Sequence, residues 1–247
     1  GIPMSYLNDA DAWNAFWETH AQALVGNHDA ITYRNHRLGR SVNDGVVTGK
    51  PNCYPYHQSP TQADWLTLVL NSNAGGSTIA AAIREKKIQL RCEPGRSILD
   101  GCGMTIARVA FRKRSATGDA LIGLSMNRTQ CRTGSDDYLV DPVLIPCGES
   151  SAAAEPMRGY LVGAYCTESE LITLRRLSFP AGVRRGDLIA FPNTAGYLMH
   201  FLESRSHQFP LAKNLVYDAS LADSRLDPID QSATGAAPSD DDHSISD

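Results

Sequence analysis

The sequence has no long hydrophobic run and no visible leader segment. Its longest apolar stretches, such as Leu66–Leu70, are far shorter than the roughly 18 residues that a membrane helix needs. No basic region followed by an apolar core opens the chain, so no signal peptide is seen. These absences predict a soluble, cytoplasmic protein without a membrane partner.

Several catalytic and metal-binding signatures are also missing. The six cysteines form no CxxC pair and no zinc-ligand spacing, and the seven histidines form no HxH or HExxH pattern. The GxSxG and GxxxxGK[ST] motifs of hydrolases and NTPases are absent as well. We therefore expect reduced thiols, no metal site, no nucleophile elbow and no NTPase activity.

The composition is otherwise that of a globular protein. Of 247 residues, 42% are hydrophobic and 20% are charged, although aromatic residues make up only 7%. This composition excludes a disordered chain, a collagen-like repeat and a disulfide-dense miniprotein. The length fits one large domain or two modest ones.

The negative charge is concentrated at the C-terminus. Asp218–Asp247 holds eight acidic residues and one arginine, so the net charge of −4 divides into −7 for this segment and +3 for the rest. The segment has no aromatic residue and is predicted to be a disordered acidic tail (218–247). The arginines of the remainder are scattered rather than clustered, which argues against a nucleic-acid partner.

The first hundred residues alternate between helical and irregular patterns. Ala12–Val25 has apolar residues at spacings of three and four and is predicted to be a helix, with Asn8 or Asp9 as its cap. Asn27–Pro60 has no sustained period and indicates a loop, with a short hairpin through Ala30–Tyr33.

A second helical region follows this loop. Thr61–Leu70 and Ile79–Lys87 are predicted to be helical, with a break or extension near Asn73–Gly76. The alternating run Ile88–Arg91 is predicted to be a strand that ends at Cys92-Glu93-Pro94-Gly95-Arg96. Helix, strand and turn in this order are typical of a βα barrel, whose active sites lie at the C-terminal ends of strands.

After Thr105 the pattern changes to short β-prone runs separated by turn residues, which predicts an all-β sandwich or small barrel. The runs are Ile106–Phe111, Ala120–Leu124, Tyr138–Ile145, Gly159–Tyr165, Leu171–Phe179, Asp187–Phe191 and Lys213–Tyr217.

Three short clusters are candidates for chemistry, and each also has an ordinary explanation. Glu93–Arg96 fits a phosphate-binding turn, but also a tight turn with a surface ion pair. Gly163–Glu170 contains Cys166, a candidate functional thiol whose ordinary explanation is a small apolar side chain buried in the core. Asn193–Tyr197 fits a β-turn with a packing tyrosine.

The order of these clusters resembles the carboxy-terminal half of the pyridoxal-phosphate (PLP) group IV decarboxylases. This family includes diaminopimelate, ornithine and arginine decarboxylases and has an alanine-racemase-like fold. The resemblance runs discontinuously over about Gly1–Tyr217 and rests mainly on Glu93–Arg96, Cys166 and Ala195–Tyr197. Leu124–Pro142 lacks the family's usual substrate-arginine signature, so the chain looks like a divergent branch.

The resemblance implies a role for particular residues. Gly1 would be the last glycine of the phosphate-cradling loop, and Glu93 would pair with the pyridinium nitrogen. Gly95 and Arg96 would hold the phosphate, and Tyr197 would add a hydroxyl donor. In a homodimer with composite sites, the partner subunit would contribute Cys166 as proton donor, with substrate contacts from the residues that follow it, Thr167 and Glu168.

The resemblance also implies an organisation of the chain. Residues 1–105 would be the C-terminal segment of a PLP-binding (β/α)8 TIM barrel, with an insertion at about 5–60, and residues 106–217 would be the β domain. With Gly1 at the phosphate loop, the chain would begin inside a longer protein. On that interpretation, the isolated chain is expected to be unstable or to fold only in its β domain.

This chain departs from the family pattern in its lysines. The family's cofactor-binding lysine lies on an early barrel strand, and no lysine here occupies that place; the five are Lys50, Lys86, Lys87, Lys113 and Lys213. The position after Cys166 is often acidic in the family, whereas Thr167 stands here and Glu168 follows.

The resemblance thus implies PLP-dependent decarboxylation of a small-molecule substrate, an amino acid of a basic or diamino kind. The alternative is a non-catalytic, decarboxylase-like protein that acts in regulation or dimerisation. A racemase on the same scaffold is a third interpretation, which Glu93 and Cys166 disfavour because alanine racemases place an arginine at the pyridine nitrogen.

Overall fold

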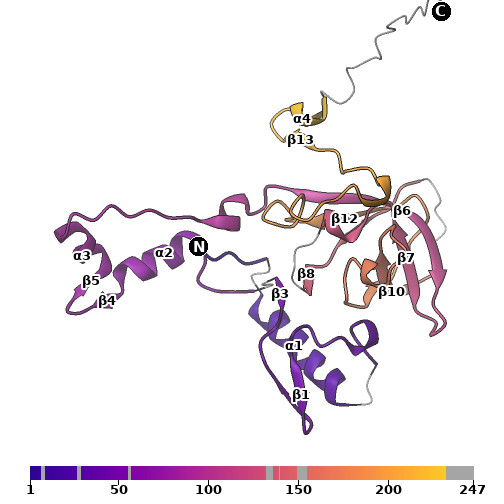
Figure 1. Ribbon diagram of the computed structural model, residues 1–247, viewed down its shortest axis with the longest axis horizontal. Helices are drawn as coiled ribbons and strands as arrows, with labels where there is room; N and C mark the ends of the chain where they lie inside the picture. Colours follow the sequence, from indigo (N-terminus) through magenta and orange to yellow (C-terminus); the bar gives the residue numbers. More distant parts are fainter. Residues whose placement is uncertain are drawn as a thin grey trace, which may run out of the picture. The chain divides into compact units, whose positions relative to one another are not determined.

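The computed structural model describes residues 1–6, 9–26, 29–54, 57–131, 136–138, 140–148 and 155–231. The chain divides into two compact units, Gly1–Glu203 and Ser204–Asp247. The boundaries expected near residues 105 and 217 stay predictions. Figure 1 shows the elements in chain order.

The N-terminal part of the first unit contains, in its described residues, three helices joined by loops and very short strands. Helix α1 begins where Asp9 accepts hydrogen bonds from the amides of Asp11 and Ala12, which confirms this residue as the cap. Its elements are α1 (Ala10–Val25), the 3-10 turn η1 (Tyr33–Asn35), β1 (Ser41–Asn43), β2 (Val46–Thr48), β3 (Cys53–Tyr54), α2 (Gln62–Asn71), β4 (Asn73–Ala74), β5 (Ser77–Thr78) and α3 (Ile79–Glu85).

The expected break between the two helices is confirmed. Strands β4 and β5 form a minimal hairpin across Gly75 and Gly76, and both glycines have positive φ. Glycine adopts this conformation without the steric cost that other residues bear. The Gly-Gly pair therefore turns the chain between α2 and α3.

Two predictions for this region are wrong. Ile88–Arg91 forms no strand, and it belongs to none of the sheets of the described residues; a strand needs a neighbour that satisfies its backbone groups. The hairpin expected through Ala30–Tyr33 is absent as well. Instead, Thr32 forms a β-bridge with Arg175, and the hairpin of this region is β1–β2.

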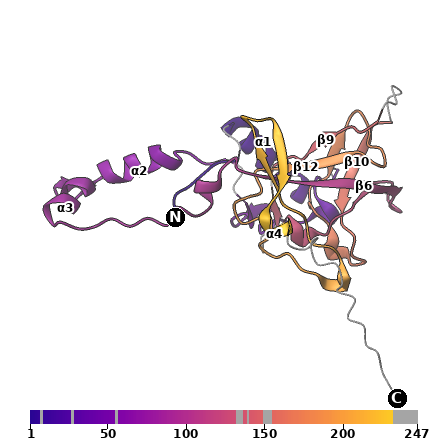
Figure 2. The ribbon, with the colours of Figure 1, turned by 90° about the horizontal axis from the view of Figure 1, so that it is seen from above.

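The second half of the first unit is a six-stranded mixed sheet with strand order β11-β10-β7-β6-β12-β9. Only the β7–β10 pair within it is parallel. Figure 2 shows β6, β9, β10 and β12 gathered together. The strands are β6 (Met104–Arg114), β7 (Ala120–Leu124), β9 (Val143–Ile145), β10 (Met157–Val162), β11 (Leu177–Phe179) and β12 (Leu188–Pro192).

Strand β6 links the two sides of the sheet. Its first half pairs with β12 and its second half with β7, with a register shift between Val109 and Phe111. A bulge of this kind increases the twist of a sheet and bends the strand. The alternating burial of residues 104–109 places one face of β6 against the core.

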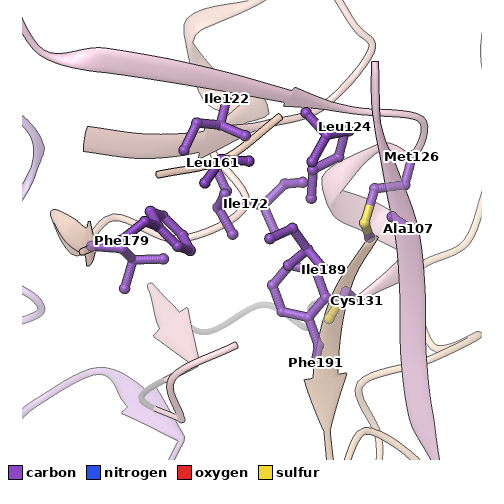
Figure 3. Close-up of a cluster of buried hydrophobic side chains, with 13 residues drawn as sticks. Ala107, Ile122, Leu124, Met126, Cys131, Leu161, Ile172, Phe179, Ile189 and Phe191 are labelled. Carbon is purple, nitrogen blue, oxygen red and sulfur yellow. The ribbon is translucent and has the colours of Figure 1, made fainter. Parts of the chain in front are cut away.

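The core is a cluster of buried aliphatic and aromatic side chains from the sheet and its loops. Figure 3 shows these side chains pointing toward one another. Ile122, Leu161, Ile189 and Phe191 are fully buried in it. At about 25 cal/mol per Å² of apolar surface, such burial is the main stabilising contribution to this part of the chain.

The second unit contains η5 (Ser206–Gln208), a two-stranded hairpin of β13 (Leu215–Asp218) and β14 (Asp223–Leu226), and α4 (Pro228–Gln231). Residues 223–231, expected in the acidic tail, are thus folded as a strand and a short helix. Residues 232–247 lie outside the described residues. None of the helices in the described ranges has the length and apolarity needed to cross a bilayer.

Candidate anion site at Arg96

Arg96 lies in η2 (Gly95–Leu99), which follows the segment Glu93-Pro94. Its guanidinium carbon lies 4.0 Å from the ring centre of Tyr54 and 5.8 Å from that of Tyr197. Its Nη1 atom is buried and has no hydrogen-bond partner. A buried charged donor without a partner is costly in free energy, so this atom is suited to an anion.

Gly95 and Tyr197 lie beside this guanidinium. Gly95 has a φ of +62°, and a Cβ atom at this position would lie 3.7 Å from the Tyr197 hydroxyl. The left-handed conformation explains why glycine stands here. The hydroxyl of Tyr197 and the backbone of Gly95 thus lie against each other.

Gly196 is required for a different reason. A Cβ atom there would lie 2.7 Å from the Cβ of Arg96 and 3.3 Å from its Cα. The loop after β12 therefore packs directly on the backbone of Arg96. Tyr197, with a φ of +66°, adopts the left-handed conformation that non-glycine residues seldom take.

Asn193 connects the loop after β12 to the segment that follows Arg96. Its side-chain nitrogen donates a hydrogen bond to the Asp100 carboxylate at 2.7 Å, and its side-chain oxygen accepts one from the amide of Gly101 at 2.8 Å. Thr194 is fully buried, and its hydroxyl lies 3.0 Å from that of Thr105 on β6. Asn193–Tyr197 is thus more than the isolated β-turn of the ordinary explanation, because these contacts join β6 and the segment that carries Arg96.

Gly1 and Glu93 lie in an adjoining region. The amide of Ile2 donates to the carbonyl oxygen of Pro94 at 3.4 Å. Both Gly1 and Glu93 line a pocket of about 230 Å³ whose other walls are mostly apolar side chains of α2 and α3. Glu93 is exposed and forms no ion pair with Arg96, so the surface ion pair of the ordinary explanation is wrong, whereas its tight turn is present at Gly95.

Cys166, Thr167 and Glu168 form a separate exposed turn around η4 (Glu168–Glu170). The ordinary explanation, a buried cysteine, is therefore wrong. Glu170 holds the turn, because its buried carboxylate accepts the amide of Arg128 at 2.6 Å and lies where Gly163 has no side chain.

Within the described residues, no ion pair or cation–π contact joins this turn to Arg96 or Tyr197. Glu168 instead forms a two-point ion pair with Arg34, at 2.9 Å for both hydrogen bonds. The two side chains are each 68% exposed, so the pair contributes about 1 kcal/mol or less. The structure thus brings Gly95, Arg96 and Tyr197 together. It places Gly1 and Glu93 in the adjoining pocket and leaves Cys166, Thr167 and Glu168 apart.

Sequence reasoning missed Tyr54, Tyr6 and Arg34. Tyr54 and Arg34 lie in the stretch Asn27–Pro60, which has no periodic signal. Tyr6 stacks edge-on against Tyr54 with ring centres 6.2 Å apart. Burial raises the pKa of Tyr6, and the positive charge of Arg96 partly offsets that increase.

The site fits a phosphate group but offers no lysine. The unpartnered Nη1 of Arg96, the glycine backbone and the tyrosine hydroxyl are the donors that a phosphate accepts from. All five lysines are exposed. No group of histidine, cysteine or carboxylate side chains in the described ranges is arranged to hold a metal ion.

The comparisons with known proteins bear on the fold. A protein of Sinorhizobium fredii (strain NBRC 101917 / NGR234), y4yA, described as uncharacterized, is 31% identical over 188 residues. The match covers 74% of this chain and 41% of that protein. No family model matches the chain.

Solved structures of decarboxylases are similar to this chain. A diaminopimelate decarboxylase superposes with a TM-score of 0.51 at 17% identity, covering 70% of this chain and 41% of its own. Diaminopimelate decarboxylase from M. jannaschii with L-lysine gives 0.49 at 17%, covering 70% and 36%. The first of these superpositions shows that the chain has a decarboxylase-like fold, and the chain spans about two fifths of that protein's length.

Proposed function

We propose that this chain is the cofactor-phosphate-binding part of a PLP-dependent amino-acid decarboxylase. The observation that carries the proposal is the Arg96 guanidinium, stacked on Tyr54, with a buried Nη1 that no protein atom satisfies. The decarboxylase-like fold and the family's clusters in the expected order support the same conclusion.

Each residue has a task in this proposal. Arg96 donates to the phosphate oxygens, with the Gly95 amide and the Tyr197 hydroxyl as further donors, and Gly1 lies next to this turn. The Glu93 carboxylate holds a proton on the ring nitrogen. When bound, PLP withdraws electrons from the substrate carbon that loses CO₂.

In this proposal the protein is a homodimer, and the turn with Cys166, Thr167 and Glu168 acts on the active site of the other subunit. There the Cys166 thiol delivers the proton that replaces CO₂, and Thr167 and Glu168 contact the side chain of the amino-acid substrate. The exposure of all three residues is compatible with such a role. Isologous C₂ dimers place two such composite sites symmetrically.

No lysine of this chain is assigned to covalent attachment of the cofactor. All five lysines are exposed, and loss of the attachment lysine from the intact protein would favour a second candidate function. In that candidate, the chain belongs to a non-catalytic, decarboxylase-like protein that binds PLP without reaction and acts in regulation or dimerisation.

The test is a PLP titration followed by borohydride reduction and peptide mapping. Charge-assisted hydrogen bonds contribute about 1.5–3 kcal/mol, so Arg96→Gln is expected to weaken binding about 10- to 100-fold. Arg114→Gln, an exposed arginine on β6 that bonds Gly118, is the matched control and should bind as the wild type does.

Two results would count against the proposal. Equal affinity of the wild type and Arg96→Gln would show that Arg96 does not hold the phosphate. Stoichiometric labelling of one lysine would show that the chain carries its own attachment residue, and the assignment of Gly1 to the phosphate loop would be wrong.

A further inference from the structure

We propose that Tyr54, a residue of the segment at about 5–60 that the family pattern does not account for, is a positioning residue for Arg96. The inference rests on the proposed function, because it concerns the same phosphate. The Tyr54 ring fixes the orientation of the Arg96 guanidinium, and the N–H donors at the edge of the guanidinium, Nη1 among them, then point at the anion.

The Arg96 guanidinium lies against the Tyr54 ring. At 4.0 Å from the ring centre, the guanidinium carbon of Arg96 lies close above the face of Tyr54. A guanidinium is planar, and its N–H donors lie in that plane. A ring against its face therefore leaves the donor edge accessible, and Nη1 is the donor left without a protein partner.

The positive charge of Arg96 also favours an aromatic neighbour. Arg96 is half-buried and belongs to no ion pair of the described residues. A partly desolvated cation without a carboxylate is stabilised by the negative face of an aromatic ring, by about 0.5 to 2 kcal/mol. An apolar side chain of equal size would fill the space but would not supply this attraction.

Tyr54 is itself held in place by its surroundings. It is 7% exposed, and its strand β3 pairs with β8 (Asp137–Tyr138), which places Tyr54 beside Tyr138. Its hydroxyl donates to the carbonyl oxygen of Tyr197 at 3.3 Å. One side chain thus contacts both segments that the proposed phosphate site requires.

The experiment measures the affinity of inorganic phosphate and of PLP for variants of Tyr54. Tyr54→Phe keeps the ring and is expected to bind within about twofold of the wild type. Tyr54→Leu removes the ring and is expected to bind about fivefold more weakly. Tyr217→Leu, an exposed tyrosine of β13, is the matched control and should bind as the wild type does.

A spectroscopic readout separates positioning from a general loss of structure. In the wild type and Tyr54→Phe, the Nε–Hε NMR resonance of Arg96, identified by its loss in Arg96→Gln, is expected to be shifted upfield by the ring. In Tyr54→Leu it should return toward its position in an unstructured peptide. If Tyr54→Leu does not fold, the wild-type resonance decides, and an unshifted signal overturns the proposal.

The two proposals fail in different ways. If Arg96→Gln weakens binding and Tyr54→Leu does not, the positioning role is wrong and the phosphate site stands. If Arg96→Gln binds as the wild type does, the phosphate site itself is wrong.

Discussion

The sheet of residues 104–192 and the helical hairpin α2–α3 use apolar residues in different ways. The sheet encloses its large side chains, and Leu161 and Phe191 are completely buried. Neither α2 nor α3 buries a single side chain, and Leu68 is 57% exposed. The comparison teaches that apolar periodicity predicts an element, whereas its stability depends on a packing partner.

Arg96 of the candidate site lies, in the sequence, between the helical hairpin α2–α3 and the first strand of the sheet, β6. Arg96 follows the hairpin, but its contacts are with Tyr54, Gly196 and Tyr197. The loop of Tyr197 is joined to β6 through the buried Thr105–Thr194 hydrogen bond. The anion site is therefore held from the side of the sheet.

The largest expected effect comes from a pair of leucine deletions. Leu161→Ala in the core should lower the free energy of unfolding by about 2–5 kcal/mol, because it leaves a cavity among buried side chains. Leu68→Ala on α2 should change it by less than about 0.5 kcal/mol. Chemical denaturation measures both, and equal losses would break the comparison between the two regions.

A smaller effect is expected at the contact between Gly196 and Arg96. Gly196→Ala adds a methyl group 2.7 Å from the Arg96 Cβ, and overpacking of this kind costs about 1–3 kcal/mol. The displaced Arg96 should also bind PLP more weakly. A variant with unchanged stability and unchanged PLP affinity would show that the loop does not pack on Arg96.

The smallest effect is a pH dependence in the helical part. His20 of α1 is fully buried, and burial lowers its pKa below the ordinary value of 6.5. The unfolded chain then binds a proton that the folded chain does not, so stability is fully present above about pH 6.5 and falls as the pH drops below it. Denaturation between pH 5 and 8 measures this loss.

The matched variant for this prediction is His20→Gln, which keeps a polar side chain at the same position without a titrating group. Its stability should change less than that of the wild type over the same pH range. An identical pH profile in the two proteins would contradict the role of His20.

The helices were the easiest elements to predict because their periodic signals are local, and α1, α2 and α3 lie within two residues of the predicted ranges. The strands agree less well, since of the run Leu171–Phe179 only Leu177–Phe179 forms a strand. Ala120–Leu124 has the same bounds in the sequence prediction and in the structure. Ile88–Arg91 has an equally clear alternating pattern and forms no strand. The pattern reports side-chain preference, but a strand also needs a neighbour for its backbone groups.

The residues of the candidate site also fall into those that the sequence indicated and those that it did not. Gly95, Arg96 and Tyr197 were found through family resemblance, and the structure places them together. Tyr54 and Arg34 left no signal, since each contacts a residue far away in sequence and neither belongs to a periodic segment. The ion pair of Glu168 with Arg34, 134 positions apart, was beyond any local pattern.

The central claim is that Arg96 holds the cofactor phosphate, and a crystal structure of the chain with PLP tests it most directly. The account predicts a phosphate within hydrogen-bond distance of the Arg96 guanidinium and of the Gly95 amide, with the Tyr54 ring still against the guanidinium face. A phosphate bound elsewhere, with Arg96 unchanged, would contradict it.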